Sequence, residues 1–192
     1  MAPVPPALIS CGKDDKINVM TAAWTGIINS EPPMTYVSIR KSRLSHTIIS
    51  ETGEFVINLP NIHLAFACDF CGVKSGRSVD KFNEMKLTPL KCQKLDTVMI
   101  GEAPISLECK VKSVTELGSH DMFTAEIISV SVDDKYINDS GRICFEKMGL
   151  LAYVHGGYYT LGRYVGKFGW SVEKKKHAKA AKAKKAHKSI KA

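Results

Sequence analysis

The sequence lacks long hydrophobic runs: none of its apolar stretches approaches the roughly 18 to 20 residues that a transmembrane helix needs. Its first ten residues, MAPVPPALIS, contain three prolines and no positive side chain, so they do not resemble a secretory signal peptide. These two absences exclude an obvious membrane anchor or export signal, and we expect a soluble, cytoplasmic protein.

Several familiar catalytic motifs are missing as well. The chain contains no G-x-G-x-x-G dinucleotide fingerprint after a strand, no G-x-S-x-G nucleophile elbow and no H-E-x-x-H zinc motif. No paired carboxylates stand out either. A Rossmann domain, a serine hydrolase and a zinc protease are therefore disfavoured, and no metal site is expected.

The six cysteines are few and scattered, which fits a reducing compartment better than a disulfide framework. Cys68 and Cys71 form a C-x-x-C pair that is compatible with a redox dithiol or half of a zinc site. Zinc needs a second pair, but Cys92, Cys109 and Cys144 stand singly. A redox dithiol typically begins a helix, whereas Cys71 directly precedes Gly72, so buried structural thiols are favoured.

The net charge of +8 is confined to the end of the chain. Residues 173–192 hold nine Lys and one Glu, whereas residues 1–172 carry 18 Lys and Arg against 18 Asp and Glu. We therefore predict a neutral globular domain at residues 1–170 and a flexible Lys/Ala-rich tail at 171–192. Weak contacts of this tail with RNA, membrane or an acidic protein are one interpretation, and a solvated solubility tail is the favoured alternative.

Apolar patterning predicts a mainly β protein with short helices. Short helices are expected at residues 45–53, with Ser45 as cap and Gly53 as stop, and at 61–72, with Asn61 as cap and Gly72 as stop. A helical turn is expected near residues 79–82. Strands are expected at residues 7–12, 17–24, 34–40, 54–60, 105–117 and 122–134, followed by a Gly- and Tyr-rich turn region at 149–162. This spacing, without βαβ alternation, favours a closed or partly closed, Greek-key-like antiparallel barrel.

Two segments have the composition of a binding site. In NVMTAAWTG (18–26), small polar side chains interrupt an apolar strand that ends at a glycine. In SIRKSRLSHT (38–47), three cations and the hydroxyl groups of Ser42, Ser45 and Thr47 lead into a helix whose free N–H groups favour an anion. The second segment is suitable for a phosphate, with a solvated basic loop as the alternative.

Together, these two segments resemble the flavin reductase-like family, whose fold is the FMN-binding split barrel. The resemblance continues through VSIRKSRLSHTIISETGEFVINLP, DFCGVKSGRSVDKF, GSHDMFTAEIISVSVDD and GGYYTLGRYVGKFG, so it covers nearly all of residues 5–170. The branch that it resembles most is the flavoredoxin group. Ala125-Glu126 departs from the Gly-Glu that is common in this family, but alanine is still small.

The resemblance implies a set of cofactor contacts. The flavin ring is expected against the end of the first segment, with Trp24 packing behind it, and the phosphate against the second segment. The implied cofactor-binding residues are Asn18, Met20, Thr21, Ala22, Ala23, Trp24, Ser38, Ile39, Arg40, Ser42, Arg43 and Thr47.

Three further positions are candidate site residues, two of them with a second interpretation. His120 falls where the family often has a histidine near the flavin and nicotinamide, so it is the candidate catalytic residue, with an exposed turn residue as the other interpretation. Lys81 reaches a phosphate or forms a surface ion pair. Phe168, with Trp170 nearby, is a candidate for covering the flavin from a partner subunit.

The function implied by the resemblance is that of a flavoprotein oxidoreductase. Noncovalent FMN is favoured over FAD, and NAD(P)H is the expected co-substrate of a flavin reductase that passes electrons to a flavin or protein acceptor. The alternative is a flavoredoxin-like electron carrier that is reduced by a partner protein. A homodimer is expected in either case. The absence of other catalytic motifs fits a cofactor that itself performs the redox chemistry.

Overall fold

The computed structural model describes residues 1–172. Residues 1–161 form one compact unit, and the described part of a second unit, residues 162–172, contains the 3-10 helix η4 (Trp170–Val172). The predicted basic tail lies outside the described residues from position 173 onward. Within residues 1–172, no helix is long and apolar enough to cross a membrane.

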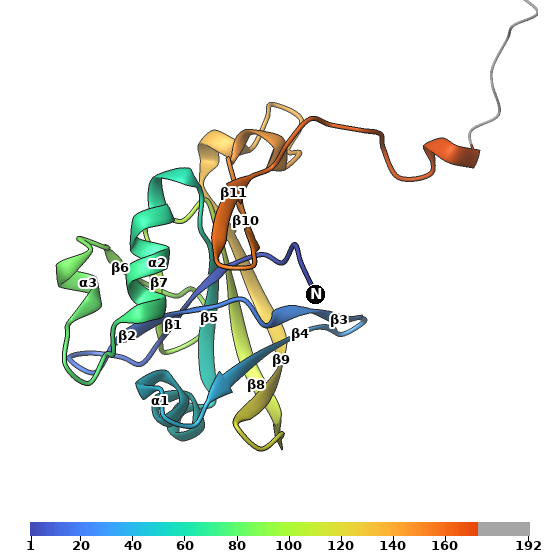
Figure 1. Ribbon diagram of the computed structural model, residues 1–192. Helices are drawn as coiled ribbons and strands as arrows, with labels where there is room; N and C mark the ends of the chain where they lie inside the picture. The colour runs from blue at the N-terminus through green and yellow to red at the C-terminus, as the bar shows by residue number, and fades with distance from the viewer. Residues whose placement is uncertain (173–192) are drawn as a thin grey trace, which may run out of the picture. The chain divides into compact units, whose positions relative to one another are not determined.

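The first unit is built mainly from antiparallel strands. Seven of them form one sheet in the order β2-β1-β5-β8-β9-β4-β3, and two hairpins stand outside it (Figure 1). The sheet strands are β1 (Ala7–Cys11), β2 (Asn18–Ala22), β3 (Thr25–Ser30), β4 (Pro33–Arg40), β5 (Glu54–Leu59), β8 (Ile105–Glu116) and β9 (His120–Val132), and the hairpins are β6 (Pro89–Lys91) with β7 (Val98–Ile100) and β10 (Leu151–Val154) with β11 (Gly157–Thr160). The predicted strands are confirmed, but β3, β6 and β7 were not predicted, and β10 and β11 lie where only a turn region was expected.

Short helices fill the connections, as predicted. Gly53 ends the first helix in the left-handed conformation, with φ of 69°. Asn61 caps the second helical segment by accepting hydrogen bonds from the amides of His63 and Leu64. These helices are α1 (Leu44–Thr52), η1 (Ile62–Leu64), α2 (Ala65–Val73) and α3 (Lys81–Glu84), with the 3-10 turns η2 (Asp134–Tyr136) and η3 (Phe145–Lys147) later in the chain.

Two of the predicted helix boundaries are wrong. Arg43, not Ser45, occupies the N-cap position of α1, because the hydroxyl of Ser45 accepts a hydrogen bond from another part of the fold. Gly72 does not end α2, which continues to Val73. Position 72 is closely packed, because a Cβ there would lie 3.3 Å from Cβ of Thr21.

The sheet is strongly curled. Its two edge strands, β2 and β3, follow each other in the sequence, and only Ala23 and Trp24 connect them. Because consecutive Cα atoms are about 3.8 Å apart, these two residues can join the edges only if the edges lie close together. Among the described residues no β ladder joins β2 to β3, so the sheet forms an open barrel with a seam beside Ala23 and Trp24.

The core has two parts that share strands β1 and β2. Alternate side chains such as Ile9 and Met20 pack with Phe55 and Phe123 inside the curled sheet. Leu8 and Val19 face the other way and pack with α2, α3 and the β6–β7 hairpin. Both faces of β1 and β2 are therefore buried, which holds the beginning of the seam in place.

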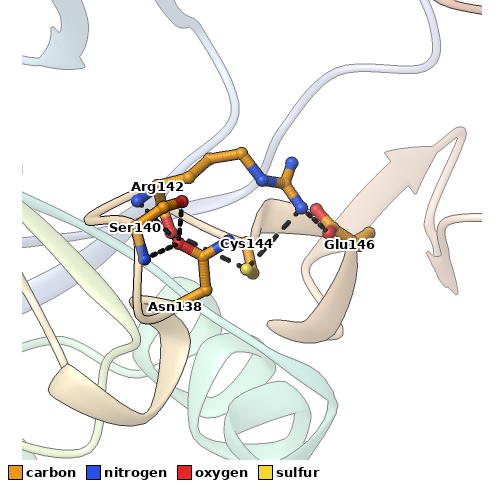
Figure 2. Close-up of polar contacts among 5 residues, drawn as sticks. All are labelled: Asn138, Ser140, Arg142, Cys144 and Glu146. Atoms are coloured by element: carbon orange, nitrogen blue, oxygen red, sulfur yellow. Dashed lines mark hydrogen bonds and ion pairs between the residues drawn. The ribbon is translucent and has the colours of Figure 1, made fainter.

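The connection between β9 and β10 is stabilised by local polar contacts (Figure 2). The Asn138 side-chain oxygen accepts hydrogen bonds from the amides of Ser140 and Arg142, at 3.1 and 2.9 Å, and from the Ser140 hydroxyl at 2.8 Å. Arg142 also pairs with Glu146. This loop leads to the β10–β11 hairpin. Isolated β-bridges pair Val4 with Tyr153 of the hairpin, and Asn61 with Leu150 directly before it.

A buried amide links four strands of the first unit. Asn58 donates to the Leu8 carbonyl and the Ser10 hydroxyl, and its oxygen accepts from the Ile100 amide and the Ser106 hydroxyl, each at 2.9 Å. Its side chain is fully buried. All four partners would be left without this contact if the amide were removed.

We predict that Asn58→Ala lowers the free energy of unfolding by about 3 kcal/mol, because buried polar groups lose their partners. Urea denaturation measures this change. Asn29→Ala is the matched control, since exposed Asn29 makes one hydrogen bond, to the Pro32 carbonyl, and its loss should cost less than about 0.5 kcal/mol. Equal effects of the two substitutions would contradict this role of Asn58.

Candidate functional site

A pocket of about 360 Å³ lies at the seam of the barrel. One wall is the strand end from Met20 to Trp24, and another is formed by β4, β9 and the loop after β4. The full lining is Pro6, Met20, Thr21, Ala22, Ala23, Trp24, Ser38, Arg40, Arg43, Asp69, Gly72, Val73, His120, Tyr153, Gly156 and Tyr158. The structure thus brings together nine of the residues that the sequence predicted.

The strand end is fixed by its contacts with α2. The Thr21 hydroxyl donates to the Cys68 carbonyl, and Gly72 packs closely against the Thr21 side chain. Ala22 and Ala23 present only methyl groups, so a flat ligand can approach the backbone here. The predicted clearance for a flavin ring at this strand end stays a prediction.

Trp24 does not pack behind the strand end as predicted. Its side chain is 57% exposed at the pocket wall, and its ring lies 4.6 Å from the His120 ring at an angle of 42°. The reason is the position of Trp24 in the connection between the two edge strands, outside the buried core. The indole offers an aromatic surface to a pocket ligand.

The loop after β4 supplies the cations of the pocket. Its turn is closed by a 3.0 Å hydrogen bond from the Arg43 amide to the Arg40 carbonyl. The Arg43 guanidinium donates to the Gly72 carbonyl at 2.8 Å and so reaches across to the end of α2. Ile39 is fully buried in the core, and Ser42 does not line the pocket.

Asn18, Thr47 and Lys81 line a second cavity, of about 550 Å³, between α1 and the segment before α3. Asn18 donates to the Ser45 hydroxyl at 2.8 Å, and this contact is buried. Arg77 donates to the Thr47 hydroxyl at 3.3 Å. These three predicted residues therefore line a cavity other than the first pocket, and their contact with a cofactor stays a prediction.

Lys81 is buried, with 3% of its surface exposed, so the predicted alternative of a surface ion pair is wrong. Its ammonium group donates to the Cys71 carbonyl at 3.1 Å. Within residues 1–172, no carboxylate forms an ion pair with it. Burial lowers the pKa of Lys81, and the neighbouring charge of Arg43 lowers it further.

His120 begins β9 directly opposite Arg40 of β4. The ring is half-buried between Trp24 and the Ser119 hydroxyl, which lies 2.9 Å from Nδ1. Burial lowers the pKa of His120, and the Arg40 charge lowers it further, so the neutral imidazole is favoured at neutral pH. A neutral imidazole can accept or donate a hydrogen bond at the pocket wall.

The C-x-x-C thiols are buried, as predicted for structural cysteines. Burial raises the pKa of Cys68 to about 12 and that of Cys71 to about 11, which suppresses the reactive thiolate. Among the described residues, no cluster of three His, Cys, Asp or Glu side chains is arranged to hold a metal ion.

The sequence did not identify the wall formed by the β10–β11 hairpin. Tyr153, Gly156 and Tyr158 line the pocket from this hairpin, and Asp69 and Val73 do so from α2. Burial raises the pKa of Tyr158, so its phenol stays protonated. Phe168 belongs to the second unit, and its predicted contact with a cofactor stays a prediction.

Comparison with known proteins agrees with this geometry. The model of the flavin reductase like domain matches residues 2–162. This chain belongs to the flavin reductase-like family. The curved, open sheet is accordingly the split barrel that the sequence predicted.

Two similar solved structures of this family are flavoredoxins. The flavoredoxin of Desulfovibrio vulgaris (Miyazaki F) is 32% identical, with a TM-score of 0.84 over 90% of this chain and 94% of that chain. The flavoredoxin of Methanosarcina acetivorans is 31% identical, with a TM-score of 0.81 over 89% and 93%. An uncharacterized protein of Archaeoglobus fulgidus is 35% identical over 122 residues, which are 64% of this chain and 69% of that protein.

For this member of the flavin reductase-like family, we predict that His120 titrates below its ordinary value of 6.5. Arg40→Ala removes a neighbouring positive charge, so the His120 pKa should rise toward that value. Proton NMR of the ring measures the titration. Arg142→Ala, in the β9–β10 loop, is the control and should leave the His120 pKa unchanged; an equal shift in both variants would contradict the Arg40 contact.

Proposed function

We propose that the chain is an FMN-binding flavoprotein and acts as an NAD(P)H-dependent flavin reductase. A bound flavin supplies hydride and electron transfer, while the protein supplies binding, orientation and electrostatic tuning. The pocket volume lies in the range of small-molecule and cofactor sites, about 300 to 1,000 Å³. The pocket would hold the flavin where free flavin or a partner protein could accept the electrons that the cofactor supplies.

The observation that carries this proposal is the burial of Lys81 without a carboxylate partner among residues 1–172. A buried charge that lacks a partner is costly, and here a second cation, Arg43, lowers the Lys81 pKa further. An anion bound between these two cations would supply the missing partner of Lys81 and would offset the repulsion between Lys81 and Arg43. The phosphate of FMN is such an anion, and Lys81 and Arg43 are the residues that would hold it.

The other pocket residues have separate roles. The backbone from Thr21 to Trp24 would meet the polar edge of the flavin ring, with Ala22 and Ala23 giving clearance. Trp24 offers an aromatic surface next to His120. His120, held neutral by burial and by Arg40, would orient the nicotinamide or the ring through a hydrogen bond without adding a charge.

A second candidate is an electron carrier that receives electrons from a protein. The two flavoredoxins that are 32% and 31% identical over about nine-tenths of this chain favour it. Anaerobic addition of NADH or NADPH to the FMN-loaded protein separates the two functions. Rapid loss of the visible flavin absorption supports the reductase, whereas loss only with a reduced protein donor supports the carrier.

The remaining assignments follow from the same proposal. We propose a homodimer in the cytoplasm, in which Phe168 of one protomer covers the flavin site of its partner. The basic tail, outside the described residues, would give weak contact with RNA, membrane or an acidic protein. FMN is favoured over FAD.

We predict that Lys81→Met weakens FMN binding by about 10- to 100-fold, because a charge-assisted contact of about 1.5 to 3 kcal/mol is lost. Methionine retains the length and most of the apolar surface of lysine. Quenching of FMN fluorescence on titration with the protein measures the dissociation constant.

Lys110→Met is the matched control, because Lys110 is exposed on β8. It should bind FMN like the parent protein. Unchanged FMN affinity in Lys81→Met would contradict the role of Lys81. A parent protein that binds neither FMN nor riboflavin would contradict the flavin proposal itself.

A further inference from the structure

Strand β9 presents two neighbouring side chains to different surroundings. His120 lines the pocket, whereas Asp121 is directed away from it and is almost completely buried, with 7% of its side chain exposed. Asp121 is paired with Ile39 of β4 on one side and with Glu116 of β8 on the other. The Asp121 carboxylate therefore lies beneath the point where β4 leaves the sheet and becomes the cationic loop.

This carboxylate contacts both ends of the segment that carries Arg43. Its Oδ2 lies 2.7 Å from Nε2 of His46, in the first turn of α1. Its Oδ1 forms a 3.4 Å ion pair with Lys41, at the start of the loop. Within residues 1–172 this ion pair is the only contact of Oδ1 with a cation, and no hydrogen bond accompanies it.

The backbone transmits this restraint to Arg43. The Arg43 amide is bonded to the Arg40 carbonyl at 3.0 Å, and the His46 amide is bonded to the Arg43 carbonyl at 3.1 Å. The His46 ring is also fixed by edge-to-face packing on Phe123, at 5.2 Å. Holding Lys41 and His46 therefore leaves the intervening residues little freedom to turn.

The loop needs such a restraint because its charges repel one another. Arg40, Lys41 and Arg43 place three positive charges within four residues. Burial raises the pKa of Asp121, but His46 and Lys41 outweigh this effect and hold the pKa below its usual range. The carboxylate is thus ionised at neutral pH and partly balances the loop.

We propose that Asp121 is a positioning residue for anion binding: it holds Lys41 and His46 so that Arg43 is kept beside the pocket for the phosphate of the cofactor. This inference rests on the proposed function and extends it to a residue that does not line the pocket. Loss of Asp121 should therefore weaken the binding of a phosphate-bearing ligand only, because a ligand without a phosphate gains nothing from the position of Arg43.

The test compares two ligands and two substitutions. Asp121→Asn keeps the shape of the side chain but removes its charge, and we expect it to weaken FMN binding about tenfold while riboflavin affinity is unchanged. Glu116→Gln is the matched control: Glu116 contacts the same Lys41 at 2.8 Å, but its side chain is 78% exposed. It should leave the affinity for both ligands unchanged.

Three results would overturn the proposal: unchanged FMN affinity in Asp121→Asn, equal loss of FMN and riboflavin affinity, or equal effects of Asp121→Asn and Glu116→Gln. If Asp121→Asn does not fold, His46→Gln and His46→Ala replace it. His46→Gln retains a donor for the carboxylate and should preserve FMN affinity, while His46→Ala should lower it selectively; equal affinities in these two variants would overturn the proposal. Failure of the parent protein to bind either FMN or riboflavin would instead indicate that the proposed function is wrong.

Discussion

The burial of a positive charge at Lys81 is the constraint on which the site depends. A buried ammonium group normally has a carboxylate partner, because its desolvation is costly. Here its hydrogen-bond acceptor is the Cys71 carbonyl; burial lowers the pKa of Lys81, and the positive charge of Arg43 lowers it further. The fold tolerates this arrangement because α2, α3 and β2 pack tightly around it. The free-energy cost of this buried, unpaired positive charge favours an anionic ligand over water at the site.

The topology explains why the pocket lies at the seam of the barrel. Strands β2 and β3 are the two edges of one curled sheet, so the two residues between them must cross the seam. The end of β2 is therefore accessible at the seam. The loop after β4 and the start of β9 meet at the same place, because Arg40 and His120 are paired across the sheet. Three segments that are distant in sequence thus converge on one cavity, which is lined by both cations and aromatic rings.

The sequence was sufficient for most of the strand pattern, because alternation of apolar side chains is a local signal. Much of the pocket was implied by the resemblance of two segments to the family, since their composition alone left a solvated basic loop as the alternative. The sequence was not sufficient for Lys81, whose burial depends on how α3 packs against β2, nor for Asp121, whose partners are in another element. Local capping preference also misassigned Ser45: a tertiary partner, Asn18, uses its hydroxyl instead. The sequence did not predict the pocket wall formed by the β10–β11 hairpin, because these residues reach the pocket only when the hairpin folds over the seam.

The most direct test of the flavin pocket is to map FMN binding by NMR of the isotopically labelled protein. The account predicts that FMN changes the backbone amide shifts of residues 21–24 and 40–43 together, with a further change at the His120 ring. These residues belong to separate segments, so a common response locates the ligand at the seam. Changes confined to another cavity, such as the one lined by residues 91–98, or no changes at saturating FMN, would contradict the account.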